Sequence, residues 1–155
     1  MARRISTKKR FPQRDFKYDN FLVSLFVNRL LKSGKKQLAR RIIYKALMLI
    51  HRRLDRNPIL VLERAISSAS PRIELTAKFA SGATYQIPTK LTRFRSTNLA
   101  VCWLIGAAKT RSEKSMILNL TNELLDASKG VGGAVKKKDE AHKMAEANKA
   151  FAIYE

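Results

Sequence analysis

The spacing of the apolar residues is what most constrains the fold of this chain. Between residues 20 and 70, and again between residues 92 and 152, apolar side chains recur at the period of an α-helix. Over residues 72–88 the period changes to two, which is typical of β-strands joined as a hairpin. Two strands alone are marginally stable in water, so the hairpin should pack on the helices or bind a partner. We therefore predict a mainly α, single-domain protein of about six helices with one protruding β-hairpin.

Turn residues separate the segments that carry the helical pattern. These segments span residues 20–32, 36–54, 58–70, 92–109, 115–128 and 134–152. The first is apolar on nearly all sides, which predicts a central, buried helix with Asp19 as its N-cap. In the third, Asn57 is the expected N-cap and Pro58 takes the first helical position. The last has only a thin apolar stripe and should lie partly exposed at the edge of the body. The residues expected to face inward in the fourth are Leu99, Trp103 and Ala107.

The strands of the hairpin are expected over residues 72–79 and 84–87. A longer turn at residues 80–83 joins them, and Pro88 closes the second strand. Basic and aromatic side chains gather on the hairpin and its exit: Arg72, Lys78, Lys90, Arg93 and Arg95 with Phe79, Tyr85 and Phe94. This mixture favours contact with RNA backbone and unstacked bases. The alternative is that the aromatic rings simply pack on the helices.

Charge indicates the kind of partner. The chain has 32 Lys and Arg against 12 Asp and Glu, a formal charge of +20, so an anionic partner, most naturally nucleic acid, is expected to neutralise it. The first 14 residues contain basic groups and no acid: Arg3, Arg4, Lys8, Lys9, Arg10 and Arg14. We predict that this segment is an anion-binding arm, disordered in the free protein. The domain bounds that we expect are residues 1–18 for the basic arm and residues 19–155 for the single helical domain, which includes the hairpin at 72–88. The alternatives for the arm are a solvated tail or the remnant of a transit peptide.

Several classes of function are excluded by what the chain lacks. The single cysteine, Cys102, cannot form an internal disulfide or a thiolate zinc site, and no apolar run is long enough to span a membrane. The step from Gly34 to Lys35 lacks the other residues of a phosphate loop. His51 and His142 have no metal-ligand partner at helical spacing. We therefore expect no catalytic residue, cofactor, metal or membrane association.

The lysines at the start of the last helical segment form a further candidate site. Lys136, Lys137 and Lys138 stand where the positive end of the helix dipole disfavours cations. An external phosphate at this helix start would offset the repulsion, which makes phosphate contact one interpretation. A plain solvated face is the other.

Four stretches of the chain resemble one protein family. The first is Asn20-x-Leu22-x3-Phe26-Val27-x6-Gly34-Lys35-Lys36-x5-Ile42-Ile43-x2-Ala46. The others are Gly82-Ala83-Thr84-Tyr85-Gln86-Ile87-Pro88, Lys114-Ser115-Met116, and Ala134-Val135-Lys136-Lys137-Lys138 leading to His142-Lys143-Met144-Ala145-Glu146-Ala147-Asn148-Lys149-Ala150-Phe151. They look like motifs of the seventh protein of the small ribosomal subunit in its bacterial and organellar form. The likeness covers roughly residues 10–155, and the last stretch is its most specific part.

The resemblance implies a six-helix body with a protruding hairpin, which agrees with the periodicity. It also implies a structural constituent of the small subunit that is a primary binder of the 3′ major domain of the rRNA and nucleates assembly of the head. The hairpin and the last helix would lie near the mRNA exit channel and the exit-site tRNA. The implied partners are rRNA, other small-subunit proteins of the head, and the platform protein eleven across the mRNA exit.

In the family, rRNA contacts fall on the basic arm, the loop at Gly34, the hairpin and the start of the fourth helix. From these regions and from other basic positions of the chain, the expected rRNA-binding residues are Arg3, Arg4, Lys8, Lys9, Arg10, Arg14, Lys35, Lys36, Arg41, Lys78, Arg93, Arg95, Arg111, Lys114, Lys136 and Lys137. The residues expected near mRNA and tRNA are Phe79, Ser81, Gly82, Ala83, Tyr85, Lys143 and Asn148.

The chain departs from the family pattern in places. Thr76, Phe79 and Ser81 stand where the family's hairpin has a lysine, an arginine and a glycine, Cys102 replaces an arginine, and the end of the chain differs. Phe79 is expected to stack on a base where the family forms an ion pair. This drift favours an organelle-encoded protein of the plastid stroma, with the bacterial cytoplasm as the alternative. The other class of function considered is a free-standing regulatory DNA- or RNA-binding protein of helix-turn-helix type, in which charge concentrates on one recognition helix.

Overall fold

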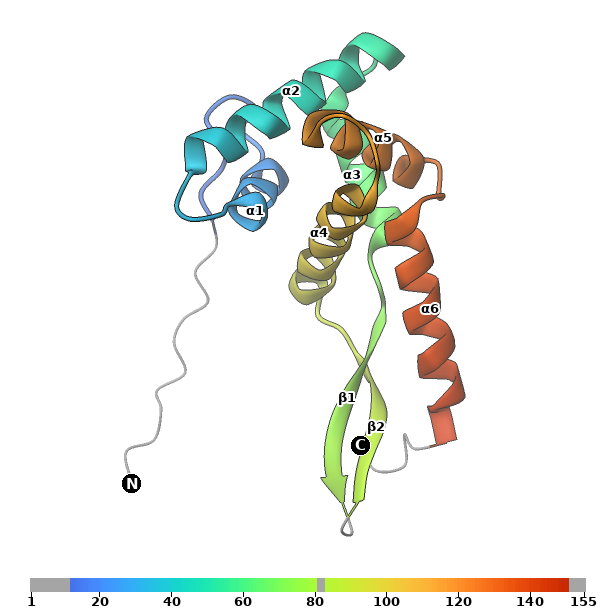
Figure 1. Ribbon diagram of the computed structural model, residues 1–155. Helices are drawn as coiled ribbons and strands as arrows, with labels where there is room; N and C mark the ends of the chain where they lie inside the picture. The colour runs from blue at the N-terminus through green and yellow to red at the C-terminus, as the bar shows by residue number, and fades with distance from the viewer. Residues whose placement is uncertain (1–11, 81–82, 151–155) are drawn as a thin grey trace, which may run out of the picture.

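A computed structural model describes residues 12–80 and 83–150 of the chain (Figure 1). Within these ranges the elements are α1 (Phe21–Leu30), α2 (Lys36–Leu54), α3 (Pro58–Ala69), β1 (Ile73–Ala80), β2 (Ala83–Lys90), α4 (Arg93–Thr110), α5 (Met116–Ser128) and α6 (Gly133–Ala147). The predicted fold class is confirmed: a mainly α single domain with one antiparallel hairpin. None of these helices is long and apolar enough to cross a bilayer.

The hydrophobic core lies between the helices. Its largest fully buried side chains include Phe26, Leu47, Ile50, Leu62, Leu104, Leu120 and Leu124. Helix α5 packs against α2, α3 and α4, so it occupies the centre of the body. The prediction that α1 is the central helix is wrong: α1 packs on α2 and α4 at one end of the molecule (Figure 1). The apolar residues around α1 that do not enter the core, such as Phe21 and Leu22, line a cleft instead.

Side-chain caps set the starts of three helices. Asn20, not the predicted Asp19, caps α1, because its Oδ1 accepts a hydrogen bond from the N–H of Leu22 at 2.7 Å. Asp19 has a positive φ of 41° and contacts Arg14 instead. The predicted cap of α3 is confirmed, with Asn57 accepting from the N–H of Ile59 and proline in the first turn. Ser115 caps α5 in the same way.

Helix α4 turns a different stripe inward from the one predicted. Val101, Leu104 and Ile105 are buried together with Ala107, whereas Leu99 and Trp103 are only half-buried. Trp103 packs on the edge of the core. The prediction is right for one residue of three: the buried stripe of α4 is the one that faces α1, α3, α5 and α6, the helices that pack on it.

The hairpin is longer than predicted. Its register pairs Ile73 with Lys90 and Ala80 with Ala83, so residues 81–82 alone connect the strands and the longer turn is wrong. Pro88 does not end β2, because in a two-stranded sheet its missing N–H can face away from the partner strand. Ile87 is fully buried, and the hairpin runs alongside α6, with its tip pointing away from the helical body (Figure 1).

Helix α6 lies at the edge of the body, as predicted. Only Ala134, Val135 and Ala145 are buried in it, so its apolar stripe is thin. The helix ends at Ala147, earlier than predicted, and the Asn148 backbone N–H and side chain both bond to the carbonyl of Met144. Residues 151–155 lie outside the described part of the chain.

The end of the predicted arm contacts the body. Residues 1–11 lie outside the described ranges, but residues 12–20 are placed against α2. The carboxylate of Asp15, 5% exposed, accepts hydrogen bonds from the Tyr44 hydroxyl at 2.8 Å and from the N–H groups of Lys17 and Tyr18. The ring of Tyr18 packs edge-on against Tyr44, with its centroid 5.7 Å away. The residues nearest the body are thus held by a buried carboxylate.

Candidate nucleic-acid interface

Cations meet at the foot of the hairpin. Arg72, Lys90 and Arg93 line a hollow of about 470 Å³ where α3 passes into β1 and β2 into α4. Hydrogen bonds fix this junction: the N–H of Leu91 donates to the Arg72 carbonyl at 3.1 Å, and the Ser96 hydroxyl donates to the carbonyl of Pro71 at 2.6 Å. All three cationic side chains are exposed. The pattern-based grouping of hairpin cations is therefore confirmed for these residues, although Arg72 and Lys90 are not among the expected rRNA-binding residues.

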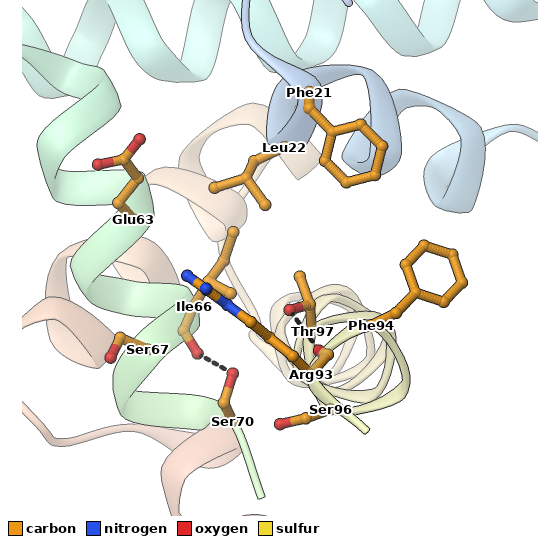
Figure 2. Close-up of a pocket in the computed structure, with 10 residues that line it drawn as sticks. All are labelled: Phe21, Leu22, Glu63, Ile66, Ser67, Ser70, Arg93, Phe94, Ser96 and Thr97. Atoms are coloured by element: carbon orange, nitrogen blue, oxygen red, sulfur yellow. Dashed lines mark hydrogen bonds between the residues drawn. The ribbon is translucent and has the colours of Figure 1, made fainter. Parts of the chain in front are cut away.

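A larger cleft of about 870 Å³ adjoins this hollow, between α1, α3 and α4 (Figure 2). Arg93 and Ser96 line both spaces, so the hollow and the cleft are neighbours. In Figure 2 the Arg93 side chain reaches from α4 toward α3, and the rings of Phe21 and Phe94 lie at one side of the cleft. Hydroxyl groups of Ser67, Ser70 and Thr97 and the carboxylate of Glu63 complete its lining. A cation among hydroxyls and rings suits the phosphate, sugar and base of a nucleotide.

Arg95 has an internal partner. Arg95 lies on the first turn of α4 and Glu74 lies on β1. The Nε and Nη2 of the arginine donate to Glu74 Oε2 at 3.3 and 3.2 Å. The arginine is 59% exposed, and an exposed ion pair of this kind contributes little to stability. A phosphate can therefore replace Glu74 as the partner of Arg95.

The hairpin presents Phe79 to solvent. Its side chain is 76% exposed, so the alternative that this ring packs on the helices is wrong. Tyr85, which pairs with Lys78 in the register, is half-buried. Ser81 and Gly82 lie outside the described residues; Ala83 begins β2.

Lys35, at the end of the loop between α1 and α2, and Lys36, the first residue of α2, are both exposed. Ser33 and Gly34 before them have positive φ values of 49° and 72°, and at Gly34 this backbone suits glycine. Lys36 also lines a polar hollow of about 260 Å³ with Arg14 and Arg40. Arg14 pairs with Asp19 at 3.1 Å on the open surface. Arg41, in the second turn of α2, is also exposed. The arm residues Arg3, Arg4, Lys8, Lys9 and Arg10 lie outside the described part of the chain.

The start of α6 already has an internal anion. Glu123 on α5 is 1% exposed, and its Oε1 accepts a hydrogen bond from the N–H of Ala134 at 3.0 Å. Glu123 thus already supplies negative charge at this helix start, beside the lysines that the dipole disfavours. Lys138 is used internally, donating to the carbonyl of Ser68 at 2.9 Å. Lys136 and Lys137 are exposed, as is Lys143 farther along α6, and their RNA contacts stay predictions.

Arg111 belongs to the same internal network. Its Nε donates to Glu123 Oε2 at 2.8 Å and its Nη2 pairs with both Glu123 and Asp126. Burial alone would lower the pKa of Arg111, but its hydrogen bonds to Asp126 and Glu123 outweigh burial and raise that pKa. The guanidinium thus ties the α4–α5 connection to α5. Lys114 in that connection is exposed.

Acidic, histidine and cysteine side chains do not gather into a metal site in the described part of the chain. The described residues contain no cluster of three His, Cys, Asp or Glu side chains able to hold a metal ion, and Cys102 is an exposed free thiol. The His142 side chain bonds to the backbone at the start of the hairpin, because its Nε2 accepts a hydrogen bond from the N–H of Arg72 at 3.1 Å. A helical body with exposed cations at several separate places is typical of one class, the proteins that bind RNA through many phosphate contacts.

Comparison with known proteins identifies the family within this class. The chain belongs to the family described as Ribosomal protein S7p/S5e, which matches residues 1–149. It is 46% identical over 154 residues to the small ribosomal subunit protein uS7c of Tupiella akineta, covering 99% of both chains. It is 45% identical over 154 residues to the small ribosomal subunit protein uS7 of Gloeothece citriformis (strain PCC 7424), again over 99% of both. The family resemblance is thus confirmed, and the chain is a structural, non-enzymatic constituent of the small ribosomal subunit that binds rRNA and ribosomal proteins.

Proposed function

We propose that this protein is a primary binder of the 3′ major domain of small-subunit rRNA and that its binding nucleates folding of the head. One observation carries the proposal: Arg72, Lys90 and Arg93 line one hollow at the foot of the hairpin, and none of the three forms an ion pair with a described carboxylate. Unpaired cations around a recess are costly for a protein alone, because they repel each other, and favourable with phosphates bound.

The other expected contacts lie on separate parts of the surface. Lys35, Lys36 and the exposed Arg41 lie at one end of α2, and Arg95 stands on the first turn of α4. Lys78 lies toward the hairpin tip. These positions are spread over several elements, which favours one large folded RNA over the single recognition helix of a regulatory DNA-binding protein.

The hairpin tip and α6 lie near mRNA and exit-site tRNA in this proposal. The exposed ring of Phe79 is suited to stack on an unpaired base, and Lys143 is exposed on the neighbouring helix. The protein partners would be other proteins of the head, with the platform protein eleven across the mRNA exit. The ribosome would be that of a plastid, which the altered hairpin tip and the likeness to uS7c support. A bacterial ribosome is the alternative, because the identity to uS7 of Gloeothece citriformis is 45%, against 46% to uS7c.

Filter binding with the isolated 3′ domain RNA tests the proposal. Full-length protein should bind saturably, and an excess of tRNA should leave most of this binding intact. Equal competition by tRNA would show that the attraction is only electrostatic. Co-sedimentation with ribosomal particles at moderate salt is the second readout, since a free-standing regulator would remain in the supernatant.

A further inference from the structure

The aromatic ring of Phe16 is held in an exposed position that neither the sequence nor the family assignment explains. Its side chain is 99% exposed, although the residue precedes α1 in a segment placed against the body. The backbone on either side is fixed, because Asp15 binds the N–H groups of Lys17 and Tyr18 as well as the Tyr44 hydroxyl. The N–H of Asp15 also donates to the carbonyl of Asn20 at 3.2 Å, which closes the turn. A buried carboxylate therefore holds a turn whose most prominent side chain is a bare phenyl ring.

Cations lie beside this ring. Phe16 lines a hollow of about 420 Å³ with Arg40, Arg41, Tyr44, Lys45 and Met48 of α2. On a helix, residues three or four positions apart share a face, so these α2 side chains form one continuous strip. Arg40, Arg41 and Lys45 make no ion pair with a described carboxylate. Asp15, the acid next to Phe16 in the chain, is buried and already bonded.

We infer that this strip, named here the Phe16 platform (Phe16, Arg40, Arg41, Tyr44, Lys45 and Met48), binds an unpaired nucleotide of RNA. The base stacks on the phenyl ring, and Arg40, Arg41 and Lys45 contact the flanking phosphates. The inference rests on the proposed function, because it takes the partner of this protein to be RNA. An acidic protein segment could match the charges, but a ring held fully in solvent by a buried network is suited to a flat aromatic partner.

A fluorescent reporter at position 16 tests the platform directly. The chain has one tryptophan, Trp103, so Phe16→Trp in a Trp103→Phe background places the single indole on the turn. The probes are oligoadenylate and inorganic polyphosphate of equal charge, with poly-glutamate as a protein-like anion. Stacking predicts saturable quenching by oligoadenylate and little change with polyphosphate or poly-glutamate. Equal responses to oligoadenylate and polyphosphate, or a stronger response to poly-glutamate, would overturn the assignment of a nucleobase.

Affinity for the 3′ domain RNA gives the second readout. Phe16→Ala should weaken binding about 5- to 150-fold. It should leave unchanged the slope of log affinity against log salt concentration (the salt slope), because the ring carries no charge. Phe16→Tyr should restore most of the affinity. Leu60→Ala is the control, since Leu60 is also exposed, at 54%, but lies on α3 outside the platform. If wild-type protein binds the RNA and Phe16→Ala matches the control, the platform is wrong and the proposed function stands; if wild-type protein shows no saturable binding, the proposed function itself fails.

Discussion

Replacing Glu123 with glutamine should destabilise the protein, although the two side chains have nearly the same shape. The Glu123 carboxylate receives the Nε–H of Arg111 at 2.8 Å and the N–H of Ala134 at 3.0 Å. A glutamine at this position would keep the bond to Ala134 only by turning its amide NH₂ toward the guanidinium. Two donors would then face each other, and the buried ion pair would lose its negative member.

The expected cost follows from these contacts. Breaking a buried ion pair by removing one partner costs about 3–5 kcal/mol. Arg111 keeps Asp126 as a partner and its side chain is 26% exposed, so water recovers part of the loss. We therefore expect about 2–4 kcal/mol, which for a chain of this length lowers Tm by about 5–15 °C.

Thermal unfolding followed by far-ultraviolet circular dichroism measures the effect. Glu140→Gln is the matched control, because it makes the same change in net charge at an exposed position of α6. Equal Tm values for the two variants would refute the reasoning that Glu123 holds α5, α6 and Arg111 together. Arg111→Gln extends the test to a predicted rRNA contact: a lowered Tm with an unchanged salt slope of RNA binding, measured below its Tm, would assign this arginine to the internal network.

Three further outcomes are expected. Deleting residues 1–11 removes five cations and keeps the Asp15 turn, so Tm should hold while the salt slope of rRNA binding becomes shallower by roughly 3–5 units; an unchanged slope would make the arm a solvated tail. Deleting residues 79–84 should leave cooperative unfolding intact and weaken function, because Phe79 is exposed; loss of cooperativity would place the tip in the core. Burial, followed by the hydrogen bond to Asp15, raises the pKa of Tyr44 to about 12, so this tyrosine contributes stability that is fully present below its ordinary pKa of 10.0 and is lost as pH rises through about 12. Asp15→Asn should move the tyrosinate titration of Tyr44 toward 10.0 in an ultraviolet absorbance titration, and an unmoved titration would count against the bond.

Local signals in the sequence predicted most of the fold. Helix α3 begins where Asn57 and Pro58 place it, because an N-cap followed by proline acts within a few residues. The cap of α1 lies one residue later than the sequence predicts, since both Asp19 and Asn20 can cap and only the structure shows Asp19 in a left-handed conformation. The place of α1 at one end of the body depends on how distant helices pack, which periodicity does not encode.

The sequence predicts the part of the candidate site that is formed by cations close to the two strands of the hairpin. Arg72 begins the first expected strand, and Lys90 and Arg93 follow the second within six residues, so a hairpin brings these three cations close together. The role of Glu123 could not be predicted, because it lies 12 positions after Arg111 and 11 before Ala134, and no local rule links these spacings. The exposure of Phe16 was equally hidden, since an apolar residue beside a helix is normally expected to be buried.

The salt dependence of binding to the 3′ domain RNA tests the central claim most directly. The claim is that the cations at the foot of the hairpin contact rRNA phosphates. Two triple variants with equal loss of charge at exposed positions are compared: Arg72→Gln/Lys90→Gln/Arg93→Gln and Arg52→Gln/Arg56→Gln/Lys129→Gln. The first should make the slope of log affinity against log salt shallower by roughly 2–3 units, and the second should change it by less than about one unit. Equal changes in the two variants would contradict the account, because they would show that only total charge matters.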